Sequence, residues 1–171
     1  MRVRWIPALL SAALVTVATP PASALAEEFP QTFTIRPHAA DRLCVNAPAA
    51  GNGSIVLLLD CAGSWGAGTR TWTSAKVGGI GDLVTIRKRD TQQCLEVAGW
   101  SRHNGASVMT WNCGPQSNQY WRVSKNADGW WLIKNENSGG CLDARIHGNW
   151  SNVYHWACHG GGEQQWKVVP A

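Results

Sequence analysis

Six cysteines, spaced in a pattern that recurs three times, constrain the fold of this chain more than any other feature. The gaps between successive cysteines are 17, 33, 19, 28 and 17 residues, so short gaps alternate with long ones. Six cysteines allow 15 disulfide connectivities. The simplest connectivity closes one loop in each of three repeated units, as Cys44–Cys61, Cys94–Cys113 and Cys141–Cys158. A zinc site is the alternative, but the chain has no C-x-x-C pair to support it.

Other residue types recur in step with the cysteines. An isoleucine stands eight or nine residues before the first cysteine of each pair, and a valine stands five residues before the second. A tryptophan follows each second cysteine, at Trp72, Trp121 and Trp166, with a mean spacing of about 47 residues. We expect these three tryptophans to lie in the core. The repeats run over about 31–80, 81–128 and 129–171, which leaves no room for a second domain.

The local sequence within each repeat predicts strands and not helices. Segments such as 32–36 and 83–87 alternate or are rich in β-branched residues, and Asn-Gly, Asp-Gly and Gly-Gly pairs separate such segments. Four short strands per repeat give an all-β chain of about twelve strands, with no helix longer than one turn. Three equivalent units around an axis form a β-trefoil with one disulfide per repeat. A sandwich or a single-sheet barrel would leave the threefold recurrence unexplained.

Residues 1–26 have the anatomy of a secretory signal peptide. Arg2 and Arg4 precede an apolar run over 5–18, and small residues follow at 22–26. A membrane anchor is the alternative, but the apolar run is too short to span a bilayer. We therefore expect residues 27–171 to be secreted into the extracellular space, where disulfides persist.

The charge balance indicates no anionic partner. The chain has 15 Lys plus Arg and 11 Asp plus Glu, and without Arg2 and Arg4 the basic count falls to 13. Apart from a short run at Arg87–Arg89, the basic residues are scattered. Nucleic-acid binding is therefore not expected, and neither is insertion into a membrane.

The recurring motifs together resemble the ricin-type β-trefoil lectin domain. Each first cysteine begins C-[LV]-[DEN], the second and third repeats contain V-x-x-W-x-C, and both end in Q-x-W. The resemblance extends from about Phe33 to Val169. It implies that each repeat can supply one shallow carbohydrate pocket. Such a pocket uses an acidic residue two after the first cysteine, an aromatic residue two before the second, and the Asn-Gln pair that begins the Q-x-W segment.

The second and third repeats retain most of this set. The third has Asp143, Trp156 and Gln164, with Glu163 where Asn is usual. The acid would accept hydrogen bonds from two neighbouring hydroxyls, and the indole would stack on the apolar face of the sugar. The second repeat has Glu96, which is one methylene longer than Asp, together with Trp111, Asn118 and Gln119.

The first repeat departs furthest from the family pattern and is expected to be structural. Asn46 stands in place of the acid, Leu59 in place of the aromatic platform, and Thr69-Arg70 in place of Asn-Gln. Its segment between Cys61 and Trp72 is also three residues longer than in the other repeats. Five further tryptophans have no threefold equivalents, and their positions do not follow from the pattern: Trp65, Trp100, Trp130, Trp131 and Trp150.

No constellation of residues points to catalysis, a cofactor or a metal. His155 and His159 have the i, i+4 spacing of a helical metal site, but they fall in a segment that is expected to be strand and turn. The acids are scattered one per repeat, which does not suit the carboxylate pair of a glycosidase. We expect a monomeric, non-catalytic lectin for galactose-type sugars or plant and microbial polysaccharides. The alternative is a non-catalytic trefoil scaffold that binds a protein or inhibits an enzyme.

Overall fold

The computed structural model describes Met1, residues 28–145 and residues 148–171, so the predicted signal segment after Met1 lies outside the described residues. The described part has 14 strands, and its helices are five single 3-10 turns. In chain order these elements are β1 (Thr32–Pro37), η1 (His38–Ala40), β2 (Leu43–Asn46), β3 (Ser54–Ile55), β4 (Leu57–Asp60), η2 (Ala67–Thr69), β5 (Trp72–Val77), β6 (Ile80–Lys88), β7 (Cys94–Val97), η3 (Ala98–Trp100), β8 (Ala106–Trp111), η4 (Ser117–Gln119), β9 (Tyr120–Lys125), β10 (Trp131–Asn135), β11 (Cys141–Asp143), β12 (Ser151–Asn152), β13 (Tyr154–Trp156), η5 (Gly162–Gln164) and β14 (Trp166–Pro170). None of the helices within the described ranges is long and apolar enough to cross a membrane.

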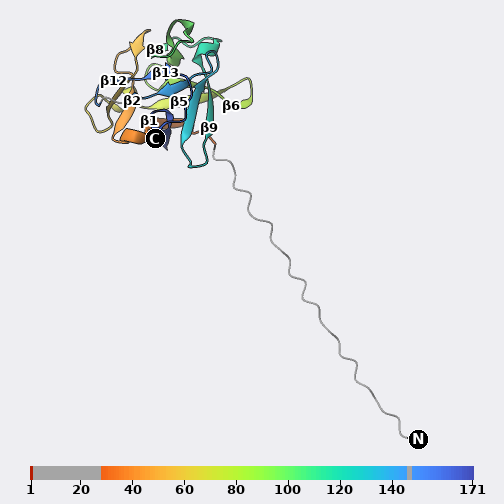
Figure 1. Cartoon of the computed structure of the whole chain (residues 1–171). Coiled ribbons are helices and arrows are strands. Elements are labelled where there is room, and N and C mark those ends of the chain that lie inside the picture. Colours follow the sequence, from red (N-terminus) through yellow and green to blue (C-terminus); the bar gives the residue numbers. More distant parts are fainter. Residues whose placement is uncertain (2–27, 146–147) are drawn as a thin grey trace.

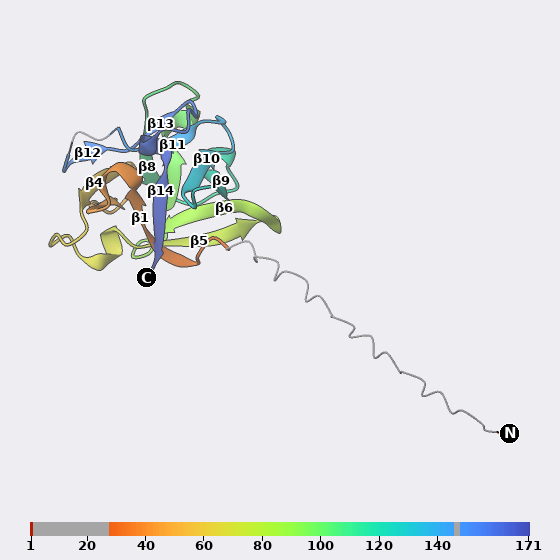
Figure 2. The same cartoon turned by 60° about the horizontal axis from the view of Figure 1, so that its bottom comes forward.

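Six strands close into a barrel, to which each third of the chain contributes two. Going round the barrel, β1 pairs with β5, β5 with β6, β6 with β9, β9 with β10, β10 with β14, and β14 with β1 again. The first and last strands of the chain therefore lie side by side (Figure 2). Closure of the barrel pairs the strand edges that would otherwise be open to other chains.

Three hairpins, also one from each third of the chain, cover one end of the barrel. They are formed by β2 with β4, β7 with β8, and β11 with β13. In Figure 1 the labelled hairpin strands β2, β8 and β13 lie toward the left and top of the molecule, whereas β6 extends to the right. The expected all-β trefoil is confirmed. The fourteen strands include two of only two residues, β3 and β12, which pair with β8 and β4 of neighbouring hairpins.

The recurring tryptophans occupy the centre of the core, as expected. Trp72, Trp121 and Trp166 are all fully buried. Each indole Nε1 donates a hydrogen bond of 2.9–3.1 Å to the carbonyl oxygen of the residue that follows the first cysteine of its own repeat, at Val45, Leu95 and Leu142. A buried indole N–H without an acceptor would be costly, so this bond explains why one residue type recurs at one position.

The disulfides join the cysteines that the spacing predicted. Cys44 is bonded to Cys61, Cys94 to Cys113, and Cys141 to Cys158. Each bond ties the two strands of one hairpin together, since the paired cysteines lie on or next to β2 and β4, β7 and β8, or β11 and β13. No cysteine is left free in the described residues.

Candidate functional site

The β7–β8 hairpin places an acid and an aromatic ring on one face in the second repeat. Cys94 lies opposite Trp111 and Glu96 lies opposite Met109 in the strand register. Because side chains two residues apart share a face, Glu96 and Trp111 are diagonal neighbours on the same side of the hairpin. Trp111 is 41% exposed, whereas Val108, three residues earlier on the opposite face, is fully buried. The hairpin thus presents an open indole beside a carboxylate.

The side chain of Gln119 holds this carboxylate in place. Its Nε2 donates hydrogen bonds to Oε2 of Glu96 at 2.8 Å and to the carbonyl oxygen of Asn112 at 2.9 Å. Its Oε1 accepts a bond from the backbone N–H of Gly114 at 2.9 Å. Gln119 is fully buried. All of its bonding groups are therefore used inside the protein, and it serves to position Glu96.

Asn118 lies beside Gln119 in η4 and is also buried. Its Nδ2 donates a hydrogen bond to the carbonyl oxygen of Val97 at 3.2 Å. Its Oδ1 has no hydrogen-bond partner.

Burial changes the acidity of Glu96. Its side chain is only 6% exposed, and this desolvation raises its pKa, against a smaller lowering by hydrogen bonds from the amides of Gln119 and Asn118. The carboxylate therefore has fewer water contacts than a surface acid.

The third repeat builds the same acid–amide pair. Nε2 of Gln164 donates to Oδ2 of Asp143 at 3.0 Å and to the carbonyl oxygen of Ala157 at 3.0 Å. Its Oε1 accepts hydrogen bonds from the backbone N–H groups of His159 and Gly160. Gln164 is fully buried and Asp143 is 2% exposed. The amide is thus committed to positioning the acid, as in the second repeat.

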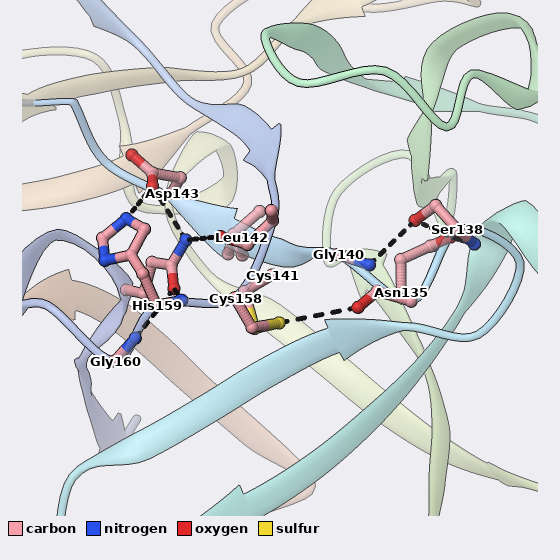
Figure 3. The surroundings of a disulfide bond; sticks show 12 residues. Asn135, Ser138, Gly140, Cys141, Leu142, Asp143, Cys158, His159 and Gly160 are labelled. Carbon is pink, nitrogen blue, oxygen red and sulfur yellow. Dashed lines mark hydrogen bonds and ion pairs between the residues drawn. A yellow bond between two sulfur atoms is a disulfide. The ribbon is translucent and has the colours of Figure 1, made fainter.

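In the third repeat, however, other side chains already contact both the Asp143 carboxylate and the Trp156 ring. The imidazole Nε2 of His159 lies 3.4 Å from Oδ2 of Asp143, and Figure 3 shows the ring turned toward this carboxylate. The guanidinium of Arg145 lies 4.2 Å from the centre of the Trp156 ring. In the second repeat the residue four after the first cysteine is Ala98 instead of arginine, so nothing equivalent covers Trp111. The second-repeat face is therefore the more open of the two.

Glu163 lies on the exposed side of η5. Its backbone carbonyl accepts a hydrogen bond from Ala144 N at 2.8 Å, which fastens η5 to the end of β11. The Glu163 side chain is exposed to solvent.

The first repeat lacks this arrangement. Asn46 is buried and accepts a hydrogen bond from the hydroxyl of Thr69 at 3.0 Å, and Leu59 is fully buried. Neither group faces solvent at this hairpin.

The two histidines that have metal-like spacing do not converge. His155 is buried in β13, and this burial lowers its pKa, whereas His159 is about half exposed beyond the end of that strand. In the described part of the chain no group of three or more His, Cys, Asp or Glu side chains is placed to hold a metal ion.

Two features of these sites were not anticipated from the sequence. The stacking of Arg145 on Trp156 is one, and the contact of His159 with Asp143 is the other. A comparison of the repeats does reveal the exchange of Ala98 for Arg145. Only the fold shows that this position lies over the aromatic platform of the neighbouring strand.

Comparison with known proteins agrees with this geometry. Residues 31–166 match the model of the ricin-type beta-trefoil lectin domain. No curated protein matches the chain. Among solved structures, the designed threefold-symmetric protein ThreeFoil has a TM-score of 0.75 and 21% identity over 82% of this chain and 99% of its own.

Two natural proteins with similar structures are larger. The Polyporus squamosus lectin, solved with the glycan Neu5Aca2-6Galb1-4GlcNAc, has a TM-score of 0.69 and 19% identity over 81% of this chain. This chain spans 48% of that lectin. The exo-beta-1,3-galactanase of Clostridium thermocellum has a TM-score of 0.74 and 19% identity over 82% of this chain, which spans 30% of the enzyme. At these identities the likeness establishes the fold, whereas the family match covers most of the chain. The chain therefore belongs to the ricin-type β-trefoil lectin family.

Proposed function

We propose that this protein is a secreted, non-catalytic lectin whose principal site is the β7–β8 face of the second repeat. The observation that carries the proposal is the buried Gln119 amide, which holds the Glu96 carboxylate 2.8 Å away beside the open Trp111 ring. A purely structural hairpin gains nothing from a desolvated acid next to an exposed indole. The first repeat supports this argument, because it has neither group and still folds as a hairpin.

At this site the sugar ring stacks its C–H face on Trp111. Two adjacent hydroxyls donate hydrogen bonds to the Glu96 carboxylate, whose charge makes these bonds stronger than neutral ones. Gln119 fixes the carboxylate before the ligand arrives, so little conformational entropy is lost on binding. Asn118, which lies beside Gln119, is buried and supports the site from within through its Nδ2 hydrogen bond to the Val97 carbonyl oxygen.

The third repeat forms a second, weaker site from Asp143 and Trp156, with Glu163 at its rim. A sugar must displace Arg145 from the indole and share Asp143 with His159. Each displaced contact subtracts from the binding free energy. Gln164 serves here as Gln119 does in the second repeat.

The ligand class we propose is a galactose-type sugar or a plant or microbial polysaccharide. Shallow, partly exposed sites of this kind have dissociation constants of about 0.1–1 mM, so retention depends on several sites binding one polymer. We propose that the protein acts as a monomer without a cofactor. Three disulfides in a chain of this size fit an extracellular location.

A glycan and polysaccharide binding screen tests the proposal. The protein is compared with its Trp111→Ala and Trp156→Ala variants, each checked for folding by circular dichroism. We expect Trp111→Ala to lose most of the binding and Trp156→Ala to lose less. Equal binding by all three folded proteins would contradict both sites. An absence of binding by the unaltered protein would favour the scaffold alternative, in which the partner is a protein.

A further inference from the structure

Three turns that bridge neighbouring repeats are held by the same two hydrogen bonds. The Oδ1 atoms of Asn52, Asn104 and Asn149 each accept a bond, of 2.7–3.1 Å, from the backbone N–H of the residue that precedes the second cysteine of another repeat. The next residue of each turn donates its own N–H to a carbonyl on the same strand, at Thr110, His155 and Leu58. These turn residues are Gly53, Gly105 and Trp150, which are therefore structural equivalents.

The two glycines lie against the aromatic platforms. A Cβ on Gly53 would lie 3.7 Å from Trp111, and a Cβ on Gly105 would lie 3.5 Å from Trp156. At the turn that lies against the first repeat, the tryptophan stands in the turn instead of on the strand. The platform position on the strand holds the fully buried Leu59, and the turn holds Trp150, which is 53% exposed. A tryptophan is thus present beside all three hairpins, but here the neighbouring turn supplies it.

The conformation of Trp150 has an energetic cost. Its φ of 71° lies in the left-handed region, where Gly53 and Gly105, both at 83°, carry no penalty. A bulky residue in this region is strained, and such strain is typical of functional positions. The structure therefore keeps an exposed indole where glycine would fold more easily.

A second exposed indole lies perpendicular to that of Trp150, and the two rings, of Trp65 and Trp150, are called the corner below. Trp65, which is 42% exposed, meets Trp150 edge to face, with ring centres 5.0 Å apart and an interplanar angle of 89°. Trp65 lies in the segment between Cys61 and Trp72, which is three residues longer than its counterparts. The insertion thus supplies the second wall of the corner.

We propose that Trp65 and Trp150 form a third carbohydrate-binding site, which takes a pyranose ring of a polysaccharide chain. This inference rests on the proposed lectin function and extends it to the repeat that lacks the family's acid. The perpendicular indoles receive the C–H face and the edge of one sugar ring.

The polar surroundings favour a polymer over a terminal sugar. Asn46, which replaces the acid, is buried and accepts a hydrogen bond from Thr69. At this position, therefore, no fixed carboxylate accepts hydrogen bonds from a pair of sugar hydroxyls. The Asp60 carboxylate is partly exposed, but it accepts a bond from Ala62 N and lies 3.8 Å from Arg42. Stacking discriminates weakly between hydroxyl configurations. The site therefore contributes most when a chain of repeated rings also occupies another site.

The variant Trp150→Gly provides a sharp test because it restores the residue found in the other two turns. It should fold at least as well as the unaltered protein, since it relieves the strained φ. Trp100→Gly is the matched control. Trp100 is also exposed, at 49%, and also has a positive φ, of 59°, but it lies in η3 of the second repeat.

The measurement is affinity electrophoresis in gels that contain soluble xylan or soluble galactan, with thermal unfolding recorded in parallel. We expect Trp150→Gly to weaken retention about 2- to 10-fold on at least one polymer. Its melting temperature should be unchanged or higher. Trp100→Gly should be retained as the unaltered protein is. Trp65→Ala should reproduce the loss caused by Trp150→Gly.

The outcomes separate this site from the principal one. If Trp111→Ala weakens retention and Trp150→Gly does not, the corner is not a sugar site and the principal site stands. If only Trp150→Gly weakens retention, the corner is the sugar site and the proposal for the second repeat fails. If the unaltered protein is retained on neither polymer, this inference is overturned. If it also binds nothing in the glycan screen, the lectin function is overturned with it.

Discussion

Arg145 and Ala98 occupy the same position of their repeats, four residues after the first cysteine, and they make two similar sites unequal. The guanidinium stacks on Trp156 at 4.2 Å, while the second repeat has only a methyl group at that position. One side chain thus decides how open an aromatic platform is. In both repeats a buried glutamine amide holds the acid, although the acid is Glu96 in one and Asp143, which His159 also contacts, in the other.

Replacing this arginine should improve the weaker site. A cation–π contact at an exposed position contributes about 0.5–1 kcal/mol, which a sugar must now displace. We expect Arg145→Ala to tighten sugar binding at the third repeat about 2- to 5-fold, measured by calorimetry in a Trp111→Ala background. Arg102→Ala removes an exposed arginine that bonds to Asn137 and serves as the control. Unchanged affinity in Arg145→Ala would show that the guanidinium does not compete with the ligand.

The buried acid of the second repeat predicts opposite effects of pH on stability and binding. Burial raises the pKa of Glu96 above its ordinary value of 4.5. At a pH between 4.5 and the raised pKa, Glu96 is protonated in the folded protein but ionised in the unfolded chain. The free energy of unfolding therefore falls as pH rises through this window. Sugar binding rises over the same window, because it needs the carboxylate.

Both effects are measurable with one variant. Urea unfolding and sugar binding are recorded from pH 4 to 7 for the protein and for Glu96→Gln. The carboxamide can still accept the Gln119 hydrogen bond but cannot ionise. We expect it to lack the decrease in stability and to bind weakly at every pH. Parallel stability curves for the two proteins would mean that Glu96 does not titrate differently in the folded state.

At the scale of the elements, each repeat combines two barrel strands with one hairpin. The indole N–H bond from Trp72, Trp121 or Trp166 reaches the first strand of the hairpin of its own repeat. The barrel and the hairpins are therefore fastened together at three equivalent points. The proposed sites lie on the hairpins, so their geometry depends on these connections.

Two tryptophans of the third repeat should differ strongly in their effect on stability. Trp166→Ala removes a fully buried ring and leaves a cavity, which should lower the free energy of unfolding by about 3–5 kcal/mol. Trp156→Ala removes a partly exposed ring and should cost far less while lowering sugar binding. Chemical denaturation of both variants measures the difference. Similar losses would show that Trp156 is a core residue and not a platform.

At the scale of the whole molecule, the asparagine turns link the three repeats in a circle. The first repeat bonds to the second through Asn52, the second to the third through Asn104, and the third back to the first through Asn149. Together with the β1–β14 pairing, these contacts join segments from the two ends of the chain.

The disulfides should provide much of the stability of this molecule. They close loops of 17, 19 and 17 residues, and each should contribute about 3 kcal/mol on the loop-entropy model. Domains of this size have about 5–15 kcal/mol in total, so reduction should lower the melting temperature sharply. Thermal unfolding with and without dithiothreitol measures this effect. Peptide mapping of the unreduced protein should give three bonds within repeats, and a bond between repeats would contradict the fold.

Much of this architecture was predictable because it recurs locally. The cysteine pairs and the three core tryptophans stand at counted offsets within one repeat, so a comparison of three short segments identified them. The family resemblance grouped Asp143 with Gln164 and Glu96 with Gln119 as members of one pocket each, and the fold adds that these side chains bond to each other, at 3.0 and 2.8 Å. These contacts lie within single repeats, where the hairpin geometry is set by the local chain.

The sequence by itself determined the trefoil, its disulfides and the residues at the candidate sites. Only the tertiary structure decided which of those sites are open. Arg145 lies over Trp156, and Trp150 takes the place of a glycine against the first repeat. Its neighbour Asn149 accepts a hydrogen bond from Asp60, 89 residues earlier in the chain. The Arg145 contact lies within the third repeat but joins the chain beyond β11 to β13, so it depends on how these two strands pair. The Asn149–Trp150 turn contacts the first repeat, and its physical basis is the packing of three units around one axis, which no single repeat encodes.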